Sequence, residues 1–158
     1  MKNISIPKFG KLHIENVIFD INGTIQYQGE ITDQLVEKIK KLKEIYNIYL
    51  ISSDTRGNLK DIAKRLDVNY VKINAENMTD AEAKSEELNK LGKNSTIAVG
   101  NGNNDALMLK NASLGILIIG SEGGGIKSLK NADVVFTSPL DVIDFLMDEK
   151  AMIATLRG

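Results

Sequence analysis

The chain has 158 residues, of which 42% are apolar and 26% are charged, and its formal net charge is −1. This length fits one domain with a sizeable core, and the near-neutral charge gives no basis for a nucleic-acid or membrane partner. Cysteine is absent, which excludes disulfides, thiol catalysis and thiolate zinc sites, and no stretch has the pattern of a signal peptide or a membrane span, so we expect a cytoplasmic protein.

Apolar runs typical of strands alternate with helical patterns along the chain. A short hairpin is expected first, from residues 4–6 and 12–14. Two buried strands are then expected at 17–19 and 48–51, and further strands at 70–73, 96–99, 114–119 and 134–136. Helices are expected at 32–46, 57–66, 80–91, 104–111, 125–131 and 140–147, the last of which closes the domain. This alternation predicts a single α/β domain over residues 1–158, Rossmann-like, with a mostly parallel sheet, helices on both faces and no large cap.

The most informative residue is Asp20, which follows the apolar run 17–19 and begins the string Asp20-Ile21-Asn22-Gly23-Thr24. A carboxylate at the C-terminal tip of a buried strand can point into the crevice where open α/β sheets bind their ligands. Asp20 is therefore a candidate nucleophile. The alternative is a structural aspartate in a turn, because Asn-Gly is a common turn dipeptide.

Polar residues also mark three later sites. Ser52 ends an expected strand and, with the amide of Ser53, can bind a phosphate oxygen, or it can cap a helix. Lys84 is expected in the first turn of a helix, where the helix dipole disfavours a cation, so it either meets an anionic ligand or is simply solvated. The string 100–105 contains glycines that allow a close approach by a ligand, and its Asp105 can contribute to a cation site.

Together these sites resemble, in order and spacing, the four motifs of the haloacid dehalogenase superfamily. The matching positions are residues 20–24, Ser52, Lys84 and residues 100–105. Residues 107–112 and 115–116 look like the stretch that follows the fourth motif in P-type ATPases and related phosphatases. The similarity is to capless, soluble members likened to the phosphorylation domain of those ATPases.

The resemblance implies a Mg²⁺-dependent hydrolase of the phosphatase type, acting on a phosphorylated substrate whose identity the sequence does not give. Asp20 would be the nucleophile that forms an aspartyl-phosphate, Asn22 would stand at the acid/base position, and Lys84 would neutralise negative charge. The implied phosphate-binding residues are Ile21, Asn22, Ser52, Ser53 and Lys84. The implied metal ligands are Asp20, Asn22 through its backbone carbonyl, Asn101 and Asp105.

Two positions depart from the family pattern. Asn22 stands where most members have the acid that protonates the leaving group and later activates water, and where P-type ATPases have Thr. Asn101 stands where members have a metal-binding acid. We therefore expect slow turnover, because losing general acid-base help costs about 10²–10⁴ in rate.

Other interpretations remain open. One is a non-catalytic binding or regulatory module that kept the fold, and a second is a dinucleotide-binding protein that uses residues 99–105, with Glu122 as the acid for the ribose. The glycine-rich string 120–128 nearly matches a P-loop, but Ile126 stands where the lysine is needed. Because no cap is inserted, residues 25–30 are the only local lid, and a homo-oligomer that covers the site is expected.

Overall fold

The centre of the molecule is a six-stranded sheet with the strand order β5-β4-β3-β6-β7-β8. The structure is a computed structural model that describes residues 1–27 and 29–158. The strands are β3 Asn16–Asp20, β4 Asn47–Ser52, β5 Asn69–Lys72, β6 Thr96–Gly100, β7 Leu114–Ile118 and β8 Val134–Phe136. Each neighbouring pair runs parallel, which confirms the fold class predicted from the strand-helix alternation.

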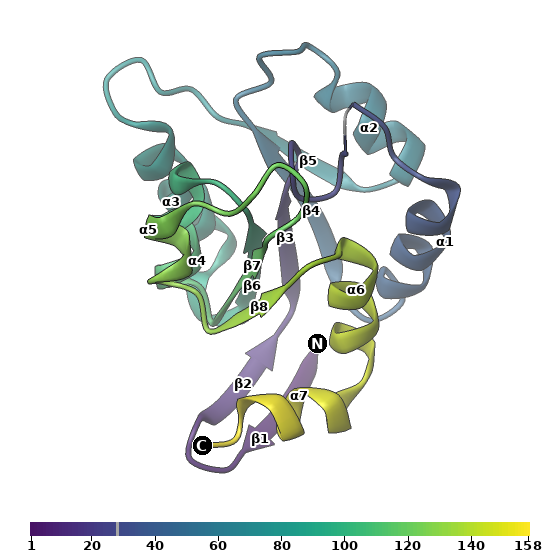
Figure 1. The fold of residues 1–158 in the computed structure, drawn as a ribbon, viewed down its shortest axis with the longest axis vertical. Helices are drawn as coiled ribbons and strands as arrows, with labels where there is room; N and C mark the ends of the chain where they lie inside the picture. The colour runs from purple at the N-terminus through teal and green to yellow at the C-terminus, as the bar shows by residue number, and fades with distance from the viewer. Residues whose placement is uncertain (28) are drawn as a thin grey trace.

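Helices cover both faces of this sheet (Figure 1). On one face lie α1 Asp33–Leu42, α2 Leu59–Leu66, α6 Pro139–Met147 and α7 Glu149–Leu156. On the other lie α3 Asp80–Leu91, α4 Ala106–Asn111 and α5 Ile126–Leu129. Two short 3-10 helices, η1 Lys93–Ser95 and η2 Asn103–Asp105, precede β6 and α4.

Two apolar cores follow from this arrangement. In β3 the side chains of Val17 and Phe19 join the core beneath α1 and α6, whereas Ile18 joins the core beneath α3 and α4. This alternation is the period of a strand, and a parallel strand covered on both faces is apolar at nearly every position. The central strand therefore brings its one carboxylate, Asp20, to the C-terminal edge of the sheet.

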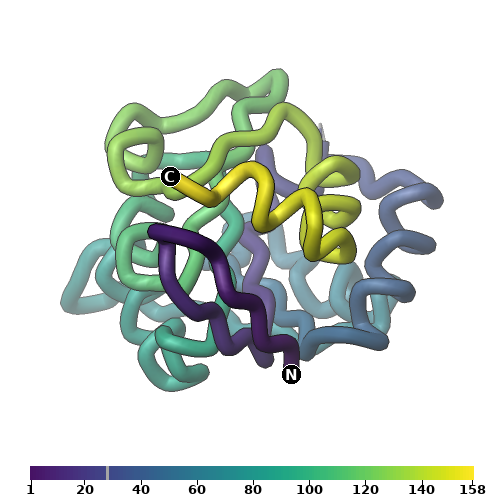
Figure 2. The backbone as a smooth tube through the Cα atoms, turned by 90° about the horizontal axis from the view of Figure 1, so that it is seen from below, coloured from purple at the N-terminus to yellow at the C-terminus, as the bar shows by residue number. Residues whose placement is uncertain are grey.

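A hairpin of β1 Lys2–Ile6 and β2 Gly10–Ile14 forms a separate antiparallel sheet, as the sequence predicts. It packs against α7, and Figure 2 shows the C-terminus beside the turn of this hairpin, with the N-terminus at the other end of β1. This end of the molecule is opposite to the end where β3, β4 and β6 terminate (Figure 1).

Several helix boundaries differ from the expectation: α2 begins at Leu59 rather than at 57, α4 begins at Ala106 rather than at 104, and α5 covers Ile126–Leu129 rather than 125–131. The helix expected over 32–46 ends at Leu42. The helix expected to close the domain is followed by α7, because Asp148 breaks α6 and its side chain then accepts hydrogen bonds from the amides of Lys150 and Ala151. Among the described residues, no helix is long and apolar enough to cross a membrane.

Candidate active site

The loops after β3, β4 and β6 meet at one edge of the sheet. From β3 the sheet continues through β4 and β5 in one direction and through β6, β7 and β8 in the other. Ligands of open α/β sheets bind at such a switch point, outside the carboxyl ends of the strands. Asp20 is the last residue of β3, and its side chain is 11% exposed. Asp20 therefore lies where a ligand of this fold would bind.

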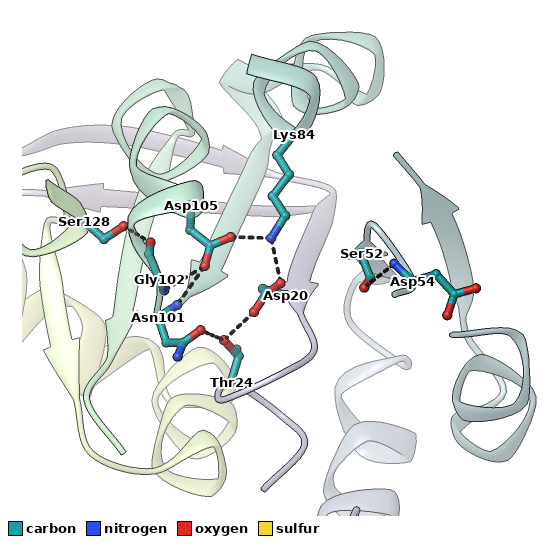
Figure 3. Close-up of polar contacts among 9 residues, drawn as sticks. All are labelled: Asp20, Thr24, Ser52, Asp54, Lys84, Asn101, Gly102, Asp105 and Ser128. Carbon is teal, nitrogen blue, oxygen red and sulfur yellow. Dashed lines mark hydrogen bonds and ion pairs between the residues drawn. The ribbon is translucent and has the colours of Figure 1, made fainter. Parts of the chain in front are cut away.

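Lys84 joins two carboxylates at this edge. Its Nζ lies 2.7 Å from Oδ1 of Asp20 and 2.7 Å from Oδ1 of Asp105 (Figure 3). The helix that carries it begins at Asp80 with Thr79 as its N-cap, so Lys84 lies in the second turn rather than in the expected first turn. The lysine is buried, and a buried cation requires such partners. The interpretation of Lys84 as a solvated surface lysine is therefore wrong.

Burial and neighbouring charges act in opposite directions on this cluster. Burial and the Asp105 carboxylate raise the pKa of the Asp20 carboxyl from its ordinary value of 3.8 to about 6, against the lowering effect of Lys84. For Lys84, burial alone lowers the pKa of the ammonium, but the two carboxylates raise it by more, so the net shift is upward. At neutral pH the cluster therefore holds a charged lysine and an Asp20 that is mostly ionised.

Asp105 fixes the backbone of the loop that follows β6. Its Oδ2 accepts hydrogen bonds of 3.0 Å from the amides of Asn101 and Gly102, while its Oδ1 contacts Lys84. A Cβ at Gly100 would lie 2.5 Å from Cγ of Asp105, so only glycine allows this approach. Both amides already donate to Asp105. They are therefore not available to bind a pyrophosphate, as the dinucleotide-binding interpretation requires.

Thr24 links Asp20 to Asn101. Its Oγ1 lies 3.2 Å from Oδ2 of Asp20 and 3.3 Å from Oδ1 of Asn101. The hydroxyl has one hydrogen, so it can donate to only one of these oxygens at a time. In the structure the Asn101 amide has its oxygen on the Thr24 side.

Ser52 ends β4, the strand beside β3. Asp20 pairs with Ile51, so Ser52 lies one residue beyond Asp20 along the neighbouring strand. Its Oγ accepts a hydrogen bond of 2.9 Å from the amide of Asp54, and among residues 1–27 and 29–158 its own hydrogen has no acceptor. The alternative interpretation of Ser52 as a helix cap is wrong, because the N-cap of α2 is Asn58. Figure 3 shows Ser52 and Asp105 on opposite sides of Asp20.

The remaining predicted phosphate-binding residues lie in the same two loops. Ile21 and Asn22 directly follow Asp20, and the Ile21 carbonyl accepts hydrogen bonds from the amides of Thr24, Ile25 and Gln26, which closes a tight turn. Ser53 follows Ser52 and is half-buried.

The donor set of the site consists of hard oxygens. Asp20, Asn22 and Asn101 offer carboxylate, carbonyl and amide oxygens, and Oδ1 of Asn22 is buried without a hydrogen-bond partner among the described residues. In the part of the chain that the structure describes, no three His, Cys, Asp or Glu side chains form a group that could enclose an ion. Mg²⁺ is commonly held by one or two carboxylates together with water, so these residues fit that ion.

Glu122, which the sequence analysis names only as the ribose acid of the dinucleotide-binding interpretation, also lies near this site. A Cβ built on Gly23 would lie 2.2 Å from Nδ2 of Asn101 and 2.7 Å from Oε2 of Glu122, so both side chains crowd the same glycine.

The expected lid, residues 25–30, borders a cavity of about 500 Å³. Residue 28 of this segment lies outside the described residues. The cavity is lined by Gln26, Gly29, Glu30, Ile31, Asn58, Asp61, Ile62 and Arg65, which come from the segment itself and from α2 and its N-cap. The lid thus lies between the Asp20 loop and α2.

Comparisons with known proteins agree with this geometry. A family model described as haloacid dehalogenase-like hydrolase matches residues 6–113. An uncharacterized protein of Methanocaldococcus jannaschii is 48% identical over 73 residues, which cover 46% of this chain and 78% of that protein. The fold resembles that of a 3-deoxy-D-manno-octulosonate 8-phosphate phosphatase from Moraxella catarrhalis, with a TM-score of 0.70, 17% identity and coverage of 92% of this chain and 94% of the other. It also resembles a phosphoserine phosphatase, with a TM-score of 0.66, 15% identity and coverage of 84% and 99%.

Proposed function

The chain belongs to the haloacid dehalogenase-like hydrolases, as its four motifs predict, and on this premise we propose that it is a Mg²⁺-dependent phosphatase that uses Asp20 as its nucleophile. The observation that carries the proposal is the contact of Lys84 with both Asp20 and Asp105 at the C-terminal edge of the sheet. The structures of the two similar phosphatases contain magnesium and phosphate ions in one case and an analogue of a phospho-aspartyl intermediate in the other.

In the first step, an Asp20 oxygen attacks the phosphorus of a phosphate monoester. A bond forms between Asp20 and phosphorus, and the ester P–O bond breaks with its electron pair leaving on the alcohol oxygen. Lys84 offsets the negative charge that accumulates on Asp20 and the phosphoryl group. The Ser52 hydroxyl and the amides of Ser53 and Ile21 bind the phosphoryl oxygens.

In the second step, water attacks the phosphorus of the aspartyl-phosphate, which releases inorganic phosphate and restores the Asp20 carboxylate. In most relatives an acid at the Asn22 position donates a proton to the leaving group and later accepts one from water. The Asn22 amide does neither at neutral pH, so solvent must supply and accept these protons. The aspartyl-phosphate is therefore long-lived and turnover is slow.

Bound Mg²⁺ supplies positive charge to the phosphoryl oxygens. Asp20, the backbone carbonyl of Asn22 and Asn101 would hold it. Asp105, the fourth predicted ligand, would act from a buried position by holding Lys84 and the backbone of Asn101.

The direct test is release of inorganic phosphate from a panel of phosphate monoesters by the purified protein, with Mg²⁺ and with a chelator instead. We expect slow release that requires Mg²⁺ and is lost in Asp20→Asn. The panel also indicates which substrates the protein prefers, because the cavity beside residues 25–30 would bind some leaving groups better than others. A protein that releases phosphate from no monoester would favour the non-catalytic module.

A further inference from the structure

We propose that Glu122 is a positioning residue for the cation site, which it supports through Asn101. Its carboxylate orients the Asn101 amide so that Oδ1 faces Asp20, and it supplies a negative charge where Asn101 has none. This inference rests on the proposed function, since it concerns the cation of that same site. It assigns a role to a residue that the family motifs do not include.

The first observation is the shared approach to Gly23. Nδ2 of Asn101 and Oε2 of Glu122 lie 2.2 Å and 2.7 Å from the position that a Cβ at Gly23 would occupy. Gly23 lies between Asn22 and Thr24 in the turn that follows Asp20. The Glu122 carboxylate, although distant in the sequence, therefore lies at the turn that contains Asn22 and beside Asn101. These two asparagines are the positions that depart from the family pattern.

The second observation is the anchoring of the loop that carries Glu122. Within this loop the amide of Gly123 donates to the carbonyl of Gly120 at 2.9 Å, and the φ angle of Gly123 is +78°. Beyond it, the amide of Gly125 donates to the carbonyl of Asn101 at 2.6 Å, and the hydroxyl of Ser128 donates to the carbonyl of Gly102. The segment after Glu122 is thus docked onto the backbone carbonyls of Asn101 and Gly102.

Tight packing supports the same conclusion. A Cβ at Gly125 would lie 2.4 Å from the backbone nitrogen of Asn103, so the chain after Glu122 passes against the fourth motif where only glycine fits. The glycines of the near-P-loop string therefore have a structural use other than phosphate binding: they allow the Glu122 loop to lie against the Asn101 loop.

The chemistry of the amide explains the effect of the charge. A carboxylate only accepts hydrogen bonds, so it favours an Asn101 orientation with Nδ2 on its side and Oδ1 on the other. Oδ1 does lie on the Thr24 side, 3.3 Å from its hydroxyl. An amide oxygen can coordinate a hard cation but carries no net charge, and the Glu122 carboxylate adds the missing negative charge nearby.

The experiment measures the dissociation constant of Mn²⁺, as a paramagnetic substitute for Mg²⁺, by the electron paramagnetic resonance signal of the free ion. It compares wild type with Glu122→Gln, Asn101→Asp and the double variant. Glu44→Gln is the matched control, because Glu44 is an exposed acid between α1 and β4, at the opposite edge of the sheet. Weaker Mn²⁺ binding in Asp20→Asn would show that the ion binds at the Asp20 site. Circular dichroism checks that each variant is folded.

We expect Glu122→Gln to raise the dissociation constant roughly tenfold, within the usual effect of outer partners of metal ligands, and Glu44→Gln to leave it unchanged. In the Asn101→Asp background, where a carboxylate needs no orientation and brings its own charge, Glu122→Gln should have little effect. An unchanged constant for Glu122→Gln would overturn the inference, as would an equal loss in both backgrounds or a wild type that binds no Mn²⁺.

Phosphate release by the same proteins separates this inference from the proposed function. If wild type binds Mn²⁺ with the predicted dependence on Glu122 but hydrolyses no monoester, the proposed function fails and the inference stands. If wild type hydrolyses monoesters and Glu122→Gln binds Mn²⁺ as wild type does, the inference fails and the proposed function stands.

Discussion

Nζ of Lys84 lies 2.7 Å from Oδ1 of Asp20, although 64 positions separate the two residues in the chain. The same nitrogen contacts Asp105, so one buried cation connects α3, the end of β3 and the loop after β6. A cation between two carboxylates allows both to be buried, and in the proposed reaction it would stay near Asp20 as that residue receives a phosphoryl group. The contact therefore serves the stability of the fold and the proposed reaction at once.

Removing this cation should destabilise the protein. Lys84→Met leaves two buried carboxylates without their partner, so we expect the free energy of unfolding at pH 7 to fall by about 3–5 kcal/mol. Lys90→Met on the same helix is the control, because Lys90 is exposed and pairs with Glu87, and loss of such a solvent-screened pair should change the stability little. Urea unfolding measures both variants, and similar losses would contradict a supporting role for the buried pairs.

The raised pKa of Asp20 predicts a pH dependence of stability. Asp20 has a pKa of about 6 in the folded protein, above its ordinary value of 3.8, so the folded state binds the proton more tightly. Its contribution to stability is therefore complete below about pH 4 and is lost as the pH rises to about 6. Relative to Asp20→Asn, metal-free wild type should lose about 3 kcal/mol over this range, at 1.36 kcal/mol per pKa unit. Unfolding of both proteins between pH 4 and 7 tests this, and a constant difference would refute it.

The proximity of Asp20 and Asp105 could be predicted because it follows from topology. Parallel strands end at the same edge of a sheet, so polar residues at their tips must gather there. The boundaries of α3 and β8 agree with the sequence prediction because clear signals mark them, such as the Thr79 capping box and Gly92 for α3. In contrast, α7 was missed because one residue, Asp148, both ends α6 and caps the next helix.

Glu122 could not be placed from the sequence, since its approach to Gly23 depends on how two loops dock. No periodicity encodes that contact, and the glycines around Glu122 are typical of a flexible connection as much as of close packing. For Lys84, the sequence placed the residue in the right helix but in the wrong turn. Burial of a lysine is decided by partners that lie far away in the chain.

Gly23 should tolerate no side chain. Its φ angle is +76°, and a Cβ would collide with Asn101 and Glu122. Gly57→Ala is a matched control, because Gly57 has a φ angle of +69° but no heavy atom of the described residues lies within 4 Å of the position that its Cβ would take. Both variants bear the strain of a positive φ, roughly 1 kcal/mol, whereas Gly23→Ala alone should also lose Mn²⁺ binding. Equal Mn²⁺ affinities in the two variants would contradict the close approach.

Asn22 should limit the second step of the reaction. Asn22→Asp restores a group that can accept a proton from water, so the aspartyl-phosphate should decay about 10-fold faster or more. Asn22→Thr is the control, because Thr offers no titratable group and should leave the decay slow. Single-turnover measurement of phosphate release gives each rate. An intermediate whose lifetime is the same in Asn22→Asp and wild type would remove Asn22 as the cause of slow turnover.

Asp20 itself should carry the phosphoryl group during turnover. Wild-type protein is incubated with a phosphate monoester and Mg²⁺, quenched, and treated with borohydride, which reduces an aspartyl-phosphate to homoserine. Peptide mass spectrometry then locates the altered residue. We predict homoserine at position 20 in wild type, and unmodified peptide when the substrate is omitted. Hydrolysis of the monoester with no modification at position 20, or with activity that survives Asp20→Asn, would contradict the proposed role of this carboxylate.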